Sequence, residues 1–265
     1  MHSGTRQHYR RCNAFTLVEL LVVIGIIALL ISILLPSLAK ARNQANAVKC
    51  ISNLRQLGMA FTMYANENRQ RLPFSSSGGN PYNEDWIWWQ ETAVASISAT
   101  IPGRPVPDPK QSSIARYVGG FNPEFFRCPG DDTVQRKSTT SGGFYRFSYS
   151  MNYRLESLIK TVPPIGAIRN SSSKILLVEE DALTINDGRW VPPLYNASQV
   201  WDTGSGKGDL LDTRHDRLKV NPDNGQYDPL PNPDYRGNVA FLDGHAEFIS
   251  RSVAHDERSV RWDKN

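Results

Sequence analysis

Two histidines and an aspartate near the C-terminal end of the chain are the residues best suited to bind a metal ion. They are His215, Asp243 and His245, and three carboxylates could complete the site: Glu179, Asp212 and Asp216. Imidazole and carboxylate groups together suit a divalent cation. The alternative is structural, because Asp243-Gly244 can supply the positive-φ turn of a hairpin and either histidine can hydrogen-bond a loop to it. We favour the turn over a catalytic metal site.

Other kinds of site have little support in the sequence. A structural calcium ion could be held by loop oxygens, including those of Asp223 and Asp228, but the loop has no recognisable calcium-ligand spacing. The sequence contains no Gly-x-Ser-x-Gly elbow, no phosphate-binding loop and no dinucleotide fingerprint. We therefore expect neither enzymatic activity nor a required cofactor.

The element that must position everything else is an apolar stretch from Phe15 to Leu35. Its 21 residues include a single charge, Glu19. As an α-helix at about 1.5 Å per residue, the stretch would be ~32 Å long, close to the thickness of the hydrocarbon core of a bilayer. The sequence therefore predicts a membrane-spanning helix.

The order of residues around this stretch differs from that of a cleavable secretory signal, in which the small residue follows the apolar run. Here Ala14 precedes the run, after a leader (residues 1–14) with three arginines and no acid. The series Ala14, Phe15-Thr16-Leu17-Val18-Glu19 and the later Pro36 resembles the N-terminus of type IV prepilins and pseudopilins. The resemblance implies that a prepilin peptidase cleaves between Ala14 and Phe15 and methylates the new amine of Phe15. That family more often has Gly at the position of Ala14.

Glu19 has a physical argument of its own. A carboxylate near the centre of a membrane helix costs roughly 2.5 to 3.5 kcal/mol, and such residues usually have a functional partner. Cleavage would create an amine at Phe15, four residues away on the same helix face. In the resembled family the carboxylate pairs with the amine of a neighbouring subunit during assembly. The alternative is a glutamate near the helix end that reaches headgroup water.

The charge of the chain argues against binding to nucleic acid. The net charge is +4, but removing the three leader arginines from the 30 basic residues leaves 27 against 26 acidic ones. The processed protein is then nearly neutral and lacks the basic excess of a phosphate binder. Basic residues on the two sides of the span are too evenly balanced to orient it. The resemblance implies a cytoplasmic leader, a single span of the inner membrane and an extracytoplasmic domain.

Cys50 and Cys128 would remain after removal of the leader, which contains Cys12. Cys50 falls in a helical pattern, and Cys128 is followed by Pro129 in a predicted loop. In an exported domain these two cysteines could form a disulfide, and closing so long a loop would contribute roughly 4 to 5 kcal/mol in the chain-entropy model. The alternative is two buried thiols. The cysteine spacing gives no zinc pattern.

Beyond Pro36, where we expect a bend, the helix should continue as an amphipathic segment over residues 37–72. Apolar residues recur at spacings of three and four: Leu38, Ala41, Ala45, Val48, Ile51, Leu54, Leu57, Phe61 and Tyr64. Polar residues occupy the remaining positions, among them Lys49, Asn53 and Arg55. This stripe predicts packing against a globular domain, and Pro73 should end the helix.

Strand signals follow in the second half of the chain. Residues 145–152 alternate apolar and polar side chains, residues 174–180 form a short apolar run, and residues 238–249 flank Asp243-Gly244 as a hairpin. A cluster of tryptophans could stack on a sugar or a base, but we expect it to fill the core: Trp86, Trp88 and Trp89.

A second resemblance covers most of the chain. It rests on several short motifs: Lys49-Cys50, Asn53-Leu54-Arg55-Gln56-Leu57-Gly58, Tyr64-Ala65-Asn66, Arg127-Cys128-Pro129, Ser148-Tyr149-Ser150-Met151-Asn152, Arg214-His215 and Phe241-Leu242-Asp243-Gly244-His245. Together they resemble a family of prepilin-like proteins that ends in a His-x9-Asp-Gly signature. In this chain 27 residues separate His215 from Asp243, so residues 219–236 resemble an insertion.

These observations predict an α+β protein of the type IV pilin-like fold. A long bent N-terminal helix would pack on an antiparallel sheet with a loop-rich distal lobe, and residues 73–265 would form the extracytoplasmic domain. The resemblance implies a pseudopilin or pilin-like subunit of a type II secretion pseudopilus or a type IV pilus-like fibre. Its partners would be prepilin peptidase, other pilin-like subunits, the inner-membrane assembly platform and membrane lipid. The alternative is a membrane-anchored extracytoplasmic metal- or ligand-binding domain or enzyme that uses the same helix as an anchor.

Overall fold

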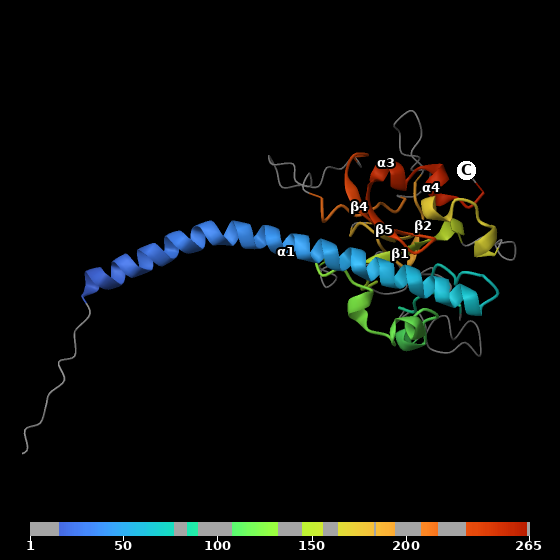
Figure 1. The fold of residues 1–265 in the computed structure, drawn as a ribbon, viewed down its shortest axis with the longest axis horizontal. Coiled ribbons are helices and arrows are strands. Elements are labelled where there is room, and N and C mark those ends of the chain that lie inside the picture. The colour runs from blue at the N-terminus through green and yellow to red at the C-terminus, as the bar shows by residue number, and fades with distance from the viewer. Residues whose placement is uncertain are drawn as a thin grey trace, which may run out of the picture. The chain divides into compact units, whose positions relative to one another are not determined.

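The computed structural model describes residues 16–76, 84–89, 108–131, 145–155, 164–182, 184–193, 208–216 and 232–263. The chain divides into two compact units, residues 1–43 and residues 44–265. One long helix, α1, runs from Leu17 to Glu67 and contributes to both units (Figure 1). The architecture is α+β, as the sequence predicts.

The first unit contains the apolar part of α1. Its large apolar side chains are exposed from Leu17, which is 78% exposed, to Leu38. Among the described residues, α1 is the helix that is long and apolar enough to cross a membrane, and none of its most apolar 18-residue stretch is buried. The helix continues through Pro36, although proline has no N–H to donate to the preceding turn. The expected bend at Pro36 stays a prediction.

Two serines in this part of α1 find hydrogen-bond partners within the helix. The hydroxyl of Ser32 donates to the carbonyl of Leu29 at 2.7 Å, and that of Ser37 donates to the carbonyl of Leu34 at 2.8 Å. Hydroxyl groups in lipid must find partners inside the protein. These two serines are therefore compatible with a lipid-facing helix.

The part of α1 in the second unit buries one face. Leu54, Leu57 and Phe61 are buried as predicted, but Val48 is 70% exposed and the buried residues begin only at Cys50. Asn53, expected on the polar side, is fully buried. Its amide donates to the carbonyls of Glu124 and Arg127 at 3.0 and 3.1 Å, and these bonds explain why a polar residue can occupy this face.

A five-stranded sheet forms the centre of the second unit. Its strands, in the order β3-β1-β2-β4-β5, are β3 (Arg189–Trp190), β1 (Tyr149–Asn152), β2 (Ile175–Glu179), β4 (Arg236–Phe241) and β5 (Ala246–Ser250). The predicted run 174–180 and the predicted hairpin 238–249 are confirmed as β2 and as β4 with β5. Short 3-10 helices lie within the described segments of this unit: Pro109–Gln111, Ala115–Val118, Pro123–Phe125, Tyr153–Leu155, Ile165–Ala167 and Ser171–Ser173.

The prediction of a purely antiparallel sheet is wrong at one edge. β1, β2, β4 and β5 pair antiparallel, but the two-residue β3 runs parallel to β1, with Met151 opposite Arg189. The strand expected over 145–152 is also shorter, because β1 begins at Tyr149. Its polar residue Asn152 is buried and donates to the carbonyls of Ile175 and Val260, both at 2.9 Å. A strand covered on both faces cannot point its polar residues at water.

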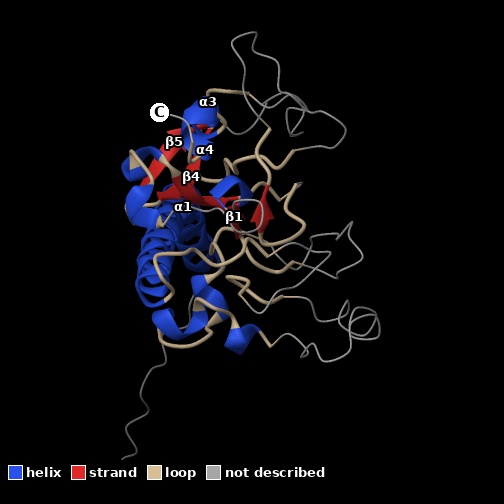
Figure 2. Cartoon of the chain, turned by 90° about the vertical axis from the view of Figure 1, so that its right-hand side faces the viewer, coloured by secondary structure: helices blue, strands red, loops and turns tan. Residues whose placement is uncertain are grey.

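Helices cover the sheet on both faces (Figure 2). On one side, Phe61 of α1 shares a core with Met151 of β1. On the other, Val239 of β4 packs with Ala254 of α3 (Arg251–Ala254) and Val260 of α4 (Glu257–Val260). The tryptophan cluster is buried, which confirms the core interpretation: Trp86, Trp88 and Trp89.

The turn between β4 and β5 packs against α1. Gly244 has a φ of 92°, as the Asp243-Gly244 hairpin signal predicts. A Cβ added to Gly58 of α1 would lie 3.3 Å from the Cα of Gly244. The two glycines therefore allow helix and turn to approach backbone to backbone.

Gly237 of β4 is a second position at which another segment of the chain comes close to the backbone. A Cβ at this position would overlap the carbonyl oxygen of Asp212 and would lie 2.8 Å from the Cγ of Leu211. Residues 211–216 therefore lie directly against β4, and His215 belongs to this segment.

Gly237→Ala should lower the free energy of unfolding by about 2 kcal/mol or more, because the added methyl must displace backbone. Urea unfolding of the full chain in detergent micelles, followed by tryptophan fluorescence, measures the loss. Gly166→Ala is the matched control, since a Cβ there meets nothing within 4 Å. Equal effects of the two substitutions would contradict the contact at Gly237.

His255 is a buried neutral histidine at the end of α3. Its Nε2 accepts from the N–H of Leu211 at 3.3 Å, and its Nδ1 lies 3.0 Å from the carbonyl of Pro193, to which it donates. Burial, followed by the charge of Arg251, lowers the pKa of His255 to about 3.

The unfolded chain binds a proton at His255 below pH ~6.5, whereas the folded chain binds it only near pH 3. The contribution of His255 to stability is therefore complete above pH ~6.5 and is lost as the pH falls toward 3. His255→Gln should flatten the dependence of unfolding free energy on pH in this window, as measured by urea unfolding at several pH values. An unchanged pH dependence would mean that the folded protein binds the proton at His255 as readily as the unfolded chain does.

Candidate functional site

The N-terminal site of the chain can be described from Thr16 onward, and Ala14 and Phe15 lie outside the described residues. Thr16 and Glu19 form a capping box at the start of α1. The carboxylate of Glu19 accepts from the backbone N–H and the hydroxyl of Thr16 at 2.9 and 2.8 Å, and the hydroxyl accepts from the N–H of Glu19 at 3.2 Å. The Thr-x-x-Glu spacing is the sequence signal that predicts this motif.

The capping box gives Glu19 a role within its own chain. Glu19 is nonetheless exposed, and so are the apolar residues that follow it. One oxygen, Oε2, accepts both bonds from Thr16, whereas Oε1 has no contact among the bonds described for this residue. The geometry therefore leaves room for a second partner of the carboxylate.

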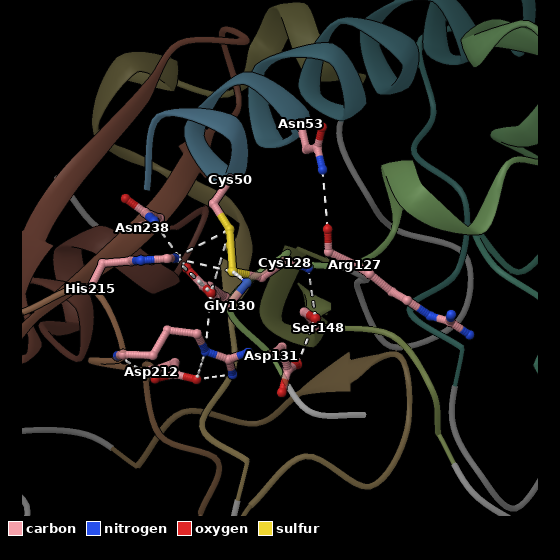
Figure 3. Close-up of a disulfide and its surroundings, with 12 residues drawn as sticks. Cys50, Asn53, Arg127, Cys128, Gly130, Asp131, Ser148, Asp212, His215 and Asn238 are labelled. Carbon is pink, nitrogen blue, oxygen red and sulfur yellow. Dashed lines mark hydrogen bonds and ion pairs between the residues drawn. A yellow bond between two sulfur atoms is a disulfide. The ribbon is translucent and has the colours of Figure 1, made fainter. Parts of the chain in front are cut away.

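A second site surrounds the disulfide between Cys50 of α1 and Cys128 (Figure 3). The structure thus contains the bonded pair rather than two thiols. Nε2 of His215 lies 3.3 Å from the Sγ of Cys50 and 3.1 Å from that of Cys128. The same nitrogen lies 3.4 Å from Oε1 of Glu179, at the end of β2. Four separate segments of the chain therefore meet at one point.

Arg214 joins three carboxylates beside the disulfide. Its NH1 lies 2.7 Å from Oδ2 of Asp131, its Nε lies 3.1 Å from Oε1 of Glu179, and it also pairs with Asp212. All four side chains are buried. Removing one partner of such a buried ion pair typically costs 3 to 5 kcal/mol, because the other charge is left uncompensated.

Glu179 stays ionised in this environment. Burial alone would raise its pKa, but the charge of Arg214 and the bonds from His215 and Asn238 together hold the pKa of Glu179 below its usual value. The amide of Asn238 donates to Oε2 at 2.9 Å. Both oxygens of the carboxylate are therefore held in place.

The weak candidates for a metal site do not come together as a set, and Asp243-Gly244 forms the hairpin turn that we favoured. His215 lies with Glu179, whereas His245 and Asp243 contact each other at the β4–β5 turn, where both are partly exposed. His245 also stacks on Phe241, with ring centroids 4.3 Å apart. Asp212 pairs with Arg214, and Asp216 accepts from the N–H of Arg236 at 2.7 Å. The calcium candidates Asp223 and Asp228 lie outside the described residues.

Sequence reasoning missed the group that the fold does assemble. Among the described residues, Cys50, Cys128, Glu179 and His215 place one ligand atom each within 4.8 Å of the others. His215 and Cys50 are 165 residues apart, so no local spacing announces their contact. The sequence signal for this group is only that Cys, His and Glu side chains can all bind a divalent metal ion.

Comparison with protein families finds the prokaryotic N-terminal methylation motif at residues 9–35. No curated protein and no solved structure matches the chain. The matched segment contains Ala14, Phe15 and Glu19, and the His-x9-Asp-Gly family stays a prediction. The motif indicates a type IV pilin- or pseudopilin-type precursor that is processed by prepilin peptidase, and the apolar part of α1 is its single-pass membrane anchor.

Proposed function

We propose that the chain is a pseudopilin or pilin-like structural subunit that assembles through α1 into a secretion pseudopilus or a type IV pilus-like fibre. Cleavage would occur between Ala14 and Phe15, with methylation of the Phe15 amine. The observation that carries this proposal is an exposed carboxylate, Glu19, at the start of the exposed apolar part of α1, which bears the methylation motif.

The exposed side chains of α1 support assembly through the helix. Lipid tails are as apolar as leucine, so helices in a membrane associate through close packing and through polar contacts rather than by the hydrophobic effect. Glu19 is the one ionisable side chain between Phe15 and Leu35 that can make such a contact. Its natural partner is the Phe15 amine of another copy, because a carboxylate and an amine neutralise each other in lipid.

The second unit fits the role of an extracytoplasmic domain on this anchor. The disulfide joins Cys50 of α1 to Cys128 across a sequence separation of 78 residues, and closing a loop of this size contributes about 4.5 kcal/mol in the chain-entropy model. Disulfides persist outside the cytoplasm. We infer an inner-membrane location, with prepilin peptidase, other pilin-like subunits, the assembly platform and lipid as partners, and without nucleic acid.

The proposed role is structural rather than enzymatic. The alternative, a membrane-anchored metal- or ligand-binding domain, is favoured by one observation, the convergence of Cys50, Cys128, Glu179 and His215. The two roles are compatible, because the anchor and the convergence lie in different parts of the chain.

Substitution of Glu19 separates assembly from capping. Glu19→Leu removes both the charge and the cap, whereas Glu19→Gln keeps an acceptor for the N–H of Thr16 and removes only the charge. We expect both variants to be processed and retained in the membrane, with crosslinked multimers reduced at least about tenfold, equivalent to about 1.4 kcal/mol. In-membrane crosslinking followed by gel electrophoresis measures the multimers.

Thr16→Val is the matched control, because it removes the hydroxyl of the capping box and keeps the carboxylate. It should assemble nearly as well as the natural chain. Cleavage must be measured in the same samples, since an unprocessed chain has no Phe15 amine. Normal multimers from processed Glu19→Gln would show that Glu19 acts as a cap only.

A further inference from the structure

The disulfide of the second unit lies among groups that bind metal ions. Sγ of Cys50 is 3.7 Å from Oε1 of Glu179, and Nε2 of His215 lies 3.4 Å from the same oxygen. Nε2 is 3.1 Å from Sγ of Cys128 and 3.3 Å from Sγ of Cys50. All four ligand atoms lie within 4.8 Å of one another.

These separations match a tetrahedral zinc site. Zinc binds thiolate sulfur at about 2.3 Å and imidazole nitrogen or carboxylate oxygen at about 2.0 to 2.2 Å, so its ligand atoms lie roughly 3.3 to 3.8 Å from each other. Nε2 of His215 lies 3.1 to 3.4 Å from the other three ligand atoms, and Oε1 of Glu179 lies 3.7 Å from Sγ of Cys50, so these distances fall within or close to this range. Only the two sulfurs are too close, because they are bonded to each other.

Neighbouring groups hold the candidate ligands in place through hydrogen bonds and an ion pair. The backbone N–H of Gly130 points to Sγ of Cys128 at 3.3 Å, and such a bond stabilises a thiolate. Asn238 fixes Oε2 of Glu179, and Arg214 lies 3.1 Å from Oε1. Two thiolates and one carboxylate around Zn²⁺ carry a net charge of −1, and the guanidinium of Arg214, which also pairs with Asp131 and Asp212, lies beside that charge.

We infer that Cys50, Cys128, Glu179 and His215 bind one zinc ion when the cysteines are thiols, so that the disulfide and the zinc complex are alternative states of one site. The thiol form exists in every newly made chain before oxidation. It also forms when a dithiol reductant transfers two electrons and two protons to the disulfide: the S–S bond breaks, two thiols form, and the reductant becomes a disulfide. Zinc then displaces both thiol protons, and two protons are released.

Gly130 lies at the edge of the ligand group. It is exposed, and a Cβ there would lie 3.4 Å from Cε1 of His215, 3.6 Å from Sγ of Cys128 and 3.8 Å from Nδ2 of Asn46. Glycine adds no side chain of its own over this edge. The zinc site does not require assembly through α1. A chain that fails to bind zinc can therefore still assemble, and a chain that fails to assemble can still bind zinc.

The test uses the full chain in detergent micelles, either oxidised or reduced with a phosphine that is then removed. Each form is incubated with Zn²⁺, desalted and submitted to elemental analysis. We expect one zinc per reduced chain and none per oxidised chain. Co²⁺ should give the absorption bands of a tetrahedral thiolate complex only in the reduced form. If reduction loosens the fold, zinc should restore its circular dichroism and raise its Tm.

Variants identify the ligands. His215→Ala should weaken zinc binding to the reduced chain at least about tenfold, and Cys128→Ser should weaken the cobalt–thiolate bands, because only the thiolate of Cys50 remains. His245→Ala is the matched control, since this histidine lies outside the ligand group and should leave binding unchanged. Zinc-free reduced protein would overturn the inference. Equal binding by oxidised and reduced protein, or by His215→Ala and the natural chain, would do so as well.

Discussion

The structure depends on one constraint, which is that α1 has two halves that need different surroundings. From Leu17 to Leu38 its apolar side chains are exposed, and each buried CH₂ group of such a side chain contributes about 0.8 kcal/mol on leaving water. From Cys50 to Ala65 the domain itself buries one face. The first half therefore requires lipid or other copies of the helix. The second half requires the sheet, which is why the turn at Gly244 and the core around Phe61 lie against it.

A group of buried charged side chains lies beside the disulfide. Buried ion pairs are often no more stabilising than well-packed apolar residues of similar volume. A fold that needed only to attach residues 126–131 and 211–216 to α1 and β2 could do so with an apolar contact. Instead, this fold buries Arg214 with three carboxylates and places Nε2 of His215 beside the sulfurs of the disulfide. The same residues surround the two cysteines for which we propose zinc binding.

Much of the fold could be predicted because its signals are local. Asp243-Gly244 predicts the hairpin, and a run of apolar residues predicts the central strand. The length of the apolar stretch, with Glu19 as its single charge, predicts the membrane anchor. The two-residue strand β3 could not be predicted, because its pairing with β1 depends on tertiary contacts. The burial of Asn53 could not be predicted either, since its hydrogen-bond partners are carbonyls more than 70 residues away in the sequence.

The functional residues divide in the same way. Thr16 and Glu19 have a recognisable spacing, and a search for capping boxes would have found them. The sequence groups His215 with Asp243 and His245 because imidazole and carboxylate groups suit a divalent ion and because all three belong to the C-terminal motifs. The fold instead brings His215 to Cys50 and Glu179, and the neighbouring Leu211 and Asp212 lie against Gly237. Contacts of such long range follow from sheet order and register, which a single sequence does not specify.

Processing of this prepilin-like chain to a mature helix that begins at Phe15 can be measured by N-terminal sequencing and intact-mass determination of the membrane-bound form. We expect N-methylated Phe15 as the first residue and the loss of residues 1–14. A membrane-bound chain that begins at Met1, or at any residue other than Phe15, would show that the chain is not processed in this way.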